Sequence, residues 1–209
     1  MKRSSIVALA LAMFMPAGAV SAAPPAPGEF AKRLFAGGIT ANDKTYACFV
    51  RTYDAAHLAK HPEQKVTVMK LLVTGEASPE DDVEYRAQGH LTQYSFRLGL
   101  RFRNRSGVYD ASGTCGYPRA AELTPDKLQL YCGVDCDGGG VTVEMANNDR
   151  STLIRLERIR IWRDNKPDDE GFEVSGGADD RVFRLDRAKL DECRALITDR
   201  TELAAIRRK

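Results

Sequence analysis

A ten-residue run of alternating apolar and polar side chains constrains the fold more than any other feature of the sequence. The run is YSFRLGLRFR, residues 94–103. Its apolar members are Tyr94, Phe96, Leu98, Leu100 and Phe102. A period of two is that of a β-strand with one face in a core and the other in solvent. The run therefore predicts a half-buried strand.

Further β signals lie along most of the chain. The predicted strands are 45–53, 65–74, 107–112, 127–134, 140–145 and 151–162. In the last of these, Ile154 and Leu156 share one phase whereas Ile159 and Ile161 share the other. One inserted residue reverses the phase of a strand, so we expect a β-bulge near Glu157 or Arg158.

The segments between these strands are short and turn-like, such as NRSG, NNDR and DCDGG. Such spacing favours consecutive antiparallel hairpins, and the absence of long helical patterns between strands argues against a parallel sheet. We expect a mainly β fold, an antiparallel meander that forms a small barrel or sandwich. Residues 163–181 are acidic and glycine-rich and are predicted to form a long surface loop.

Helical patterns occur only near the two ends. EFAKRLFAGG (29–38) predicts a short N-terminal helix with Phe30 and Leu34 on its apolar face. Near the C-terminus we expect a helix over 187–198, capped by Asp186 and packed on the sheet. Asp199 and Glu202 have the spacing of a capping box, which predicts a second short helix.

The first 22 residues have the features of a secretory signal. Lys2 and Arg3 precede an apolar run that is too short to span a membrane, and cleavage is expected after Ala22 or Ala23. We take 23–29 as a proline-rich leader and 30–209 as one domain. Removing the signal takes away two of 31 basic residues and leaves 29 against 29 acidic ones. A net charge of zero does not favour a nucleic-acid partner.

Five cysteines follow the signal, and in an oxidising compartment such as the periplasm distant cysteines usually form disulfides. We predict Cys48 with Cys193, tying the first strand to the tail helix. We also predict Cys115 with either Cys132 or Cys136, with Cys136 taken as the partner. Cys132 and Cys136 are in phase with the apolar residues of their strand, which predicts that both sulfurs are buried. An odd count leaves one cysteine unpaired.

The stretch CGVDCDGGGVTVE (132–144) could be a redox pair, a metal loop or a tight turn. In an extended chain, residues four apart lie roughly 13 Å from each other, too far for a disulfide between Cys132 and Cys136. Asp135 and Asp137 are weak candidates for a calcium site, because an EF-hand would need further oxygen ligands at Gly139 and Ala146. We therefore expect a hairpin turn in which the glycines supply positive φ.

Candidates for catalysis or metal binding are sparse. His57 and His61 have the helical spacing of a zinc pair, but Pro62 directly follows and a short helix capped by Asp54 is the preferred interpretation. Cys115 could be a nucleophile only if a histidine such as His57 or His90 approached it. We expect no metal and no cofactor.

Arginines follow two of the predicted strands and suggest a binding surface. The candidate ligand-binding residues are Arg97, Arg101, Arg103, Arg158 and Arg160. If the two strands were neighbours, their guanidinium groups would form one face for a carboxylate or phosphate. An ordinary solvated face neutralised by acidic residues is the competing interpretation.

Together these features favour an exported, periplasmic or secreted, non-catalytic binding module for an anionic ligand or a protein partner, without a membrane span. One alternative is a hydrolase or metal-dependent enzyme that uses Cys115 with a histidine, or Asp135 with Asp137. Another alternative is a structural envelope protein.

Overall fold

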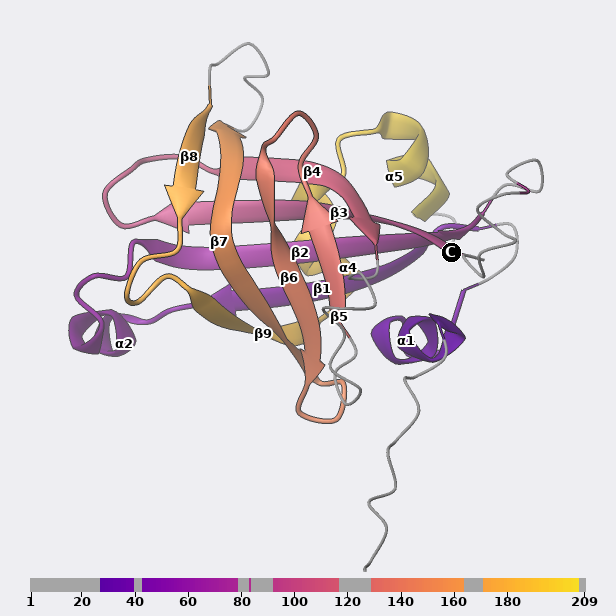
Figure 1. Ribbon diagram of the computed structural model, residues 1–209, viewed down its shortest axis with the longest axis horizontal. Helices are drawn as coiled ribbons and strands as arrows, with labels where there is room; N and C mark the ends of the chain where they lie inside the picture. Colours follow the sequence, from indigo (N-terminus) through magenta and orange to yellow (C-terminus); the bar gives the residue numbers. More distant parts are fainter. Residues whose placement is uncertain are drawn as a thin grey trace, which may run out of the picture.

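The computed structural model describes residues 27–39, 43–78, 83, 92–116, 129–163 and 171–206 (Figure 1). The elements in chain order are α1 (Pro27–Leu34), β1 (Thr45–Thr52), α2 (Ala55–Lys60), β2 (Val66–Ala77), β3 (Thr92–Phe102), β4 (Tyr109–Gly116), β5 (Gln129–Gly133), β6 (Gly139–Ala146), β7 (Ser151–Arg163), β8 (Phe172–Ser175), β9 (Val182–Ala188), α4 (Leu190–Cys193), a 3-10 turn (Arg194–Leu196) and α5 (Arg200–Ile206). The expected signal segment and His90 lie outside the described residues.

The strands form one antiparallel sheet that curls into a barrel-like ring. Each of β1 to β7 pairs with the next strand along the chain, from β1 with β2 to β6 with β7. Strand β9 then pairs with both β7 and β1 and so connects the two ends of the meander. In Figure 1, β5, β6 and β7 cross in front of β2 and β3. The predicted mainly β fold with a short N-terminal helix and C-terminal helices is confirmed, as a ring rather than a sandwich.

The alternating run that predicted a strand forms most of β3. Tyr94, Phe96, Leu98 and Leu100 are buried in the main core, whereas Arg101 is exposed. Helix α1 adds its apolar face to the same core. Phe30 meets the Tyr94 ring edge-on, with 6.2 Å between centroids. Each such aromatic side chain contributes about 1.5 to 3 kcal/mol by leaving water.

Helix α1 begins at Pro27, inside the segment expected to be an unpacked leader. Proline is well suited to a first helical position, because its fixed φ is helical and no hydrogen bond from its nitrogen is needed there. Arg187 of β9 ties the other end of the helix to the sheet. Its guanidinium donates to the backbone oxygens of Arg33 and Leu34 at 3.0 and 2.8 Å, and it lies over the Phe49 ring.

The bulge expected in the long strand is present in β7. Arg158 opposes Gly140 of β6 and Leu156 opposes Val141, so Glu157 is the extra residue. Ile154 and Leu156 before the bulge and Ile159 and Ile161 after it are all buried. The inserted residue thus keeps both apolar pairs on the inner face.

The stretch 132–144 is a hairpin turn between β5 and β6, as predicted. Positive φ occurs at Cys136, Asp137 and Gly139, so the glycines supply it at only one of three positions. Gly140 serves a different purpose: a Cβ there would lie 2.3 Å from the backbone oxygen of Cys132. Glycine at this position allows the two strands to approach.

Two disulfides link distant parts of the chain. Cys48 of β1 is bonded to Cys193 of α4, as predicted. Cys115 is bonded to Cys132, its direct partner across β4 and β5. The choice of Cys136 as that partner, and its expected burial, were wrong: Cys136 is free and exposed. Strand β5 ends at Gly133, and the turn carries Cys136 out of the inward-facing phase.

The tail differs from the expected helix over 187–198. Asp186 and Arg187 belong to β9, and helix occupies only Leu190–Cys193 before a 3-10 turn. The predicted second helix is confirmed as α5, in which the Asp199 side chain accepts a hydrogen bond from the backbone NH of Glu202 at 2.7 Å. Among the described residues, no helix has both the length and the apolar character needed to cross a bilayer.

The segment 163–181 is not a single loop. Strand β8 lies within it and pairs with the second half of β7, from Arg158 opposite Ser175 to Ile161 opposite Phe172. Residues 164–170 lie outside the described part. At its other end, Asp180 is buried and accepts hydrogen bonds from the backbone NH groups of Lys65 and Val66, at 2.7 and 3.3 Å.

The two disulfides are expected to contribute unequally to stability. They close loops with sequence separations of 145 and 17 residues. Chain-entropy reasoning assigns about 5 kcal/mol to the first and about 3 kcal/mol to the second. In denaturant unfolding followed by circular dichroism, C48A/C193A should therefore lower the free energy of unfolding more than C115A/C132A. Equal losses would contradict this order. C136S serves as the control and should leave stability unchanged.

Candidate functional site

The five arginines that the sequence marks as ligand candidates lie along two strands that do not pair with each other. They lie on or directly after β3 and on β7, and β4 stands between these strands in the sheet. The condition for a common guanidinium surface is therefore not met. Arg97 forms a bidentate ion pair with Glu202, at 2.9 and 2.8 Å.

Two more of the five are held by neighbouring groups. Arg103 donates to the backbone oxygen of Leu58 at 2.9 Å and so helps to cap the end of α2. Arg158 donates to Glu173 Oε2 and to the backbone oxygen of Asp137, both at 3.0 Å. These contacts fit the interpretation of an arginine face that is neutralised within the chain.

Arg101 and Arg160, the remaining two, are exposed. The Arg160 guanidinium lies 6.0 Å from the centre of the Trp162 ring. Arg101 lines a small hollow of about 100 Å³ beside Leu196. Ligand binding by these two residues stays a prediction.

The candidates for an enzyme or a metal site do not come together. Cys115 is bonded to Cys132 and so has no thiol to act as a nucleophile. Asp135 and Asp137 are exposed on the turn after β5. In the described ranges, no group of three or more histidine, cysteine, aspartate or glutamate side chains is placed to hold a metal ion.

His57 and His61 lie on helix α2 and on its C-terminal cap. Asp54 caps the helix by accepting a hydrogen bond from the backbone NH of His57 at 2.7 Å, as predicted. The two imidazoles stack with 4.4 Å between ring centres. Gln64 Oε1 lies 3.0 Å from His57 Nε2, and Asp179 Oδ1 lies 3.4 Å from His61 Nδ1. The sequence therefore predicted the helix correctly.

The same histidines line a basic hollow. We call it the arginine hollow; it has a volume of about 470 Å³ and is lined by Arg51, Tyr53, His57, His61, Gln64, Ala178, Asp179, Arg181, Val182 and Arg184. Its wall combines the end of β1, helix α2, the segment before β9, and β9 itself. Three guanidinium groups line the hollow with the carboxylate of Asp179, and Asp186 pairs with two of them, so the balance of fixed charge is positive by one.

The three arginines of this hollow differ in their partners. Arg51 and Arg184 both bind Asp186, at 3.2 and 3.0 Å. The Nε of Arg51 is buried and has no hydrogen-bond partner among the described residues. Arg181 is exposed, and its side chain makes no hydrogen bond or ion pair with them either. Donors of Arg181 and Arg184 therefore remain available in the hollow, whereas Arg51 Nε is enclosed by protein atoms.

Tyr53 forms the apolar part of this wall. The Arg51 guanidinium lies 5.3 Å from the centre of its ring, and the His57 ring lies 4.6 Å away on the helix side. Burial raises the pKa of the Tyr53 hydroxyl above its ordinary value, and the nearby charge of Arg51 offsets this only in part. The hydroxyl therefore stays protonated at neutral pH and can donate a hydrogen bond.

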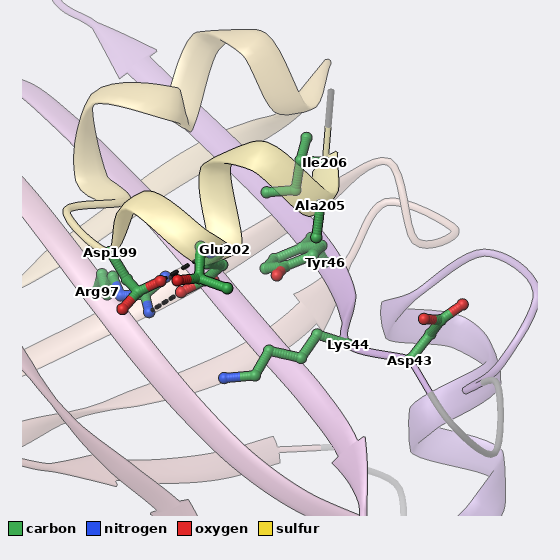
Figure 2. Close-up of a pocket in the computed structure, with 9 residues that line it drawn as sticks. Asp43, Lys44, Tyr46, Arg97, Asp199, Glu202, Ala205 and Ile206 are labelled. Atoms are coloured by element: carbon green, nitrogen blue, oxygen red, sulfur yellow. Dashed lines mark hydrogen bonds and ion pairs between the residues drawn. The ribbon is translucent and has the colours of Figure 1, made fainter. Parts of the chain in front are cut away.

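A second hollow lies on the outer face of the sheet beneath α5 (Figure 2). We call it the C-terminal hollow; it has a volume of about 550 Å³ and is lined by Asp43, Lys44, Tyr46, Arg97, Asp199, Thr201, Glu202, Ala205 and Ile206. In Figure 2 the Glu202 carboxylate points from α5 toward Arg97 of β3. Glu202 is the most deeply buried carboxylate of this hollow, with 6% of its side chain exposed.

The charges of Arg97, Glu202 and Tyr46 are coupled. Burial opposes ionisation of Glu202, but the hydrogen bonds and charge of Arg97, with the hydrogen bond from Tyr46, outweigh burial and lower its pKa below the usual value. Burial also raises the pKa of Tyr46, and the adjacent Glu202 carboxylate raises it further. At neutral pH the cluster is thus a guanidinium, a carboxylate and a neutral phenol.

The sequence pointed to Arg97 in one hollow and to His57 and His61 in the other, but it did not predict which residues join them. Arg51 and Arg184 stand in separate segments, and only the pairing of β1 with β9 makes them neighbours. A usable signal was present in the two arginines of RVFR (181–184), which lie three residues apart. The expected surface loop 163–181 included Arg181, and no strand was predicted for the residues that follow it.

Comparison with known proteins adds no relative to these observations. No protein-family model, curated protein or solved structure matches the chain. What the chain binds is therefore inferred from the charges and hydrogen-bonding groups of the two hollows.

The lowered pKa of Glu202 predicts a pH-dependent contribution to stability. A carboxyl group whose pKa is lower in the folded state stabilises the fold above its unfolded pKa, and this stabilisation is lost as the pH falls through the folded pKa. At pH 7, E202Q should therefore lower the free energy of unfolding by about 1.5 to 3 kcal/mol, the range for a hydrogen bond to a charged group. The deficit should shrink progressively on acidification below about pH 4.

The measurement is denaturant unfolding at several pH values. The matched control is E192Q, because Glu192 is an exposed glutamate of the neighbouring helix α4. A deficit in E202Q that is the same at pH 7 and in acid would show that the carboxylate charge is not what stabilises the contact.

Proposed function

We propose that this protein is an exported, non-catalytic module that binds a small oxyanion, a carboxylate or phosphate group, in the arginine hollow. The observation that carries the proposal is the convergence of Arg51, Arg181 and Arg184 on one hollow that also contains His57 and His61. Guanidinium groups present planar, paired donors that match the geometry of carboxylate and phosphate oxygens.

The unused donors support an anion rather than a neutral ligand. A guanidinium carries five N–H donors; Arg184 uses its Nη2 on Asp186, and the Arg181 side chain uses none among the described residues. Arg181 brings a charge with no acidic partner among the described residues. The Asp186 carboxylate pairs with one guanidinium nitrogen of Arg51 and one of Arg184, and these contacts orient both side chains.

The arginines of the hollow are better suited to binding an anion than to catalysing its conversion. Arginine stays protonated at any ordinary pH, so it supplies fixed charge and does not exchange protons. The nucleophile that an acyl-transfer enzyme would need is not offered by Cys115, which is bonded to Cys132. The aromatic wall of Tyr53 and His57 could pack against an apolar part of the ligand.

Export is proposed from the N-terminal signal pattern and is compatible with two disulfides, which persist in the periplasm or outside the cell. The mature N-terminus is expected at Ala23 or Pro24 when the protein is recovered from the periplasm and sequenced. An unprocessed chain in the cytoplasm would contradict export.

Binding can be tested by calorimetric titration with inorganic phosphate and with succinate at low ionic strength. We expect R181Q to weaken binding of the preferred probe at least tenfold, since one charge-assisted hydrogen bond is worth about 1.5 to 3 kcal/mol. Arg181 is exposed and its side chain has no partner among the described residues, so the substitution should leave folding intact.

The matched control is R155Q. Arg155 lies on β7, is paired with Glu144 at 3.5 Å and does not line the arginine hollow. It should bind the probe as the wild type does. Equal binding by R181Q, or no binding of either probe, would overturn the proposal. In the second case, capture of a protein partner would favour a structural envelope protein.

A further inference from the structure

Glu202 occupies its site in the way a bound ligand would. Its carboxylate accepts two hydrogen bonds from Arg97, at 2.9 and 2.8 Å, and Tyr46 lines the same hollow. Figure 2 shows the two Arg97 contacts as dashed lines, with Tyr46 beside them. Both receptor side chains come from strands of the sheet, β3 and β1, whereas the carboxylate comes from α5. The receptor is thus part of the rigid ring, and its occupant is part of the tail.

Helix α5 has few other attachments. It is seven residues long, and isolated helices shorter than about 12 residues are marginal in water. Besides Glu202, its side chains that pack on the outer apolar cluster are Leu203 and Ile206, both only partly buried. The Cys48–Cys193 disulfide fixes the preceding helix α4 to β1, so α5 can leave the sheet while the rest of the tail stays in place.

We propose that Arg97 and Tyr46 form a receptor site for an acidic, amphipathic helical segment of a partner protein, and that α5 is its tethered occupant. The partner segment presents a glutamate, followed one and four residues later by aliphatic side chains. This is the pattern of Glu202, Leu203 and Ile206, in which the residues four apart lie on one helix face. On binding, the partner displaces α5 from the sheet.

The surroundings of the receptor match such a segment. Beside the carboxylate position, the C-terminal hollow of about 550 Å³ extends toward Lys44 and Asp43. Lys44 is only loosely paired with Glu76, at 3.8 Å. The Lys44 ammonium group could pair with a second acidic residue of the partner, provided that residue stays clear of Asp43 and Asp199, which also line the hollow. The outer apolar cluster around Leu72 offers the aliphatic contact that Leu203 and Ile206 now make.

Tethering explains why α5 rather than a partner fills the site in the isolated chain. A short linker holds a segment at an effective concentration in the millimolar range. To displace α5, a partner must therefore bind the vacant receptor with a dissociation constant well below that effective concentration. Removing the α5 carboxylate should make the receptor accessible to a segment supplied separately.

The test uses a fluorescent peptide with the sequence DRTELAAI, residues 199–206, and the full-length variant E202A. In fluorescence anisotropy, the peptide should bind E202A at least tenfold more tightly than it binds the wild type. A control peptide with glutamine in place of the glutamate should bind E202A at least tenfold more weakly. The matched double variant R97A/E202A should bind neither peptide.

Equal binding of the glutamate and glutamine peptides to E202A, or no binding, would overturn the proposal. Binding of propionate to E202A without binding of the peptide would also overturn it, in favour of a small carboxylate ligand. Hydrogen exchange on the wild type gives a second test that needs no substitution. Excess peptide should raise exchange at Thr201–Ile206 at least tenfold and leave β1 unchanged. Unaltered protection in α5 would contradict displacement.

Discussion

The pairing of strand β9 on both of its edges is the constraint on which the rest of the structure depends. Strand β9 hydrogen-bonds to β1 on one side and to β7 on the other. A meander of β1 to β7 alone would leave two open edges, each a row of unpaired backbone groups. Because β9 joins those edges, the inner faces of the strands enclose the main core. The arginine hollow exists for the same reason, since Arg51 and Arg184 meet only where β1 and β9 adjoin.

The outer face of the sheet depends on a covalent bond instead. Cys48 and Leu72 point away from the main core and form a second apolar cluster with Cys193 and Ile197. A short tail could not hold this position by apolar contact alone, because its helices are only four and seven residues long. The Cys48–Cys193 bond keeps the tail in place. The ion pair of Glu202 with Arg97 then positions the last helix.

Features with a local cause could be predicted from the sequence. The alternation around Phe96 specified a half-buried strand. The change of phase after Leu156 predicted a bulge near Glu157 or Arg158, and the extra residue is Glu157. The Asp199 cap followed from side-chain spacing. Strand β8 was missed because it is four residues long and has one partner strand. Strand β9 was partly taken for helix, because RLDRAKL also suits a helix and only the neighbouring strands decide between the two.

The candidate site was less accessible to prediction. The sequence marked Arg97 and Arg158 because they repeat along strands, yet both are neutralised by acidic residues from distant segments. Nothing in the local sequence around Glu202 predicts that its carboxylate pairs with Arg97, which lies 105 residues earlier in the chain. The alternation predicted that Cys136 points inward like Cys132. The turn after Gly133, in which Cys136 has a positive φ, ends this alternation, so Cys136 is exposed.

By itself, the sequence determined the mainly β character, the inward face of each long strand and the hairpin at 132–144. These features follow from side-chain period and turn residues, which act over short stretches. The pairing of Cys48 with Cys193 was predicted as one of several possible pairings, and the structure confirms it. Only the tertiary structure decided that β9 closes the ring, that Cys132 pairs with Cys115, and which arginines remain available. A period of two specifies which way a side chain points, but the long-range strand pairing specifies what it meets.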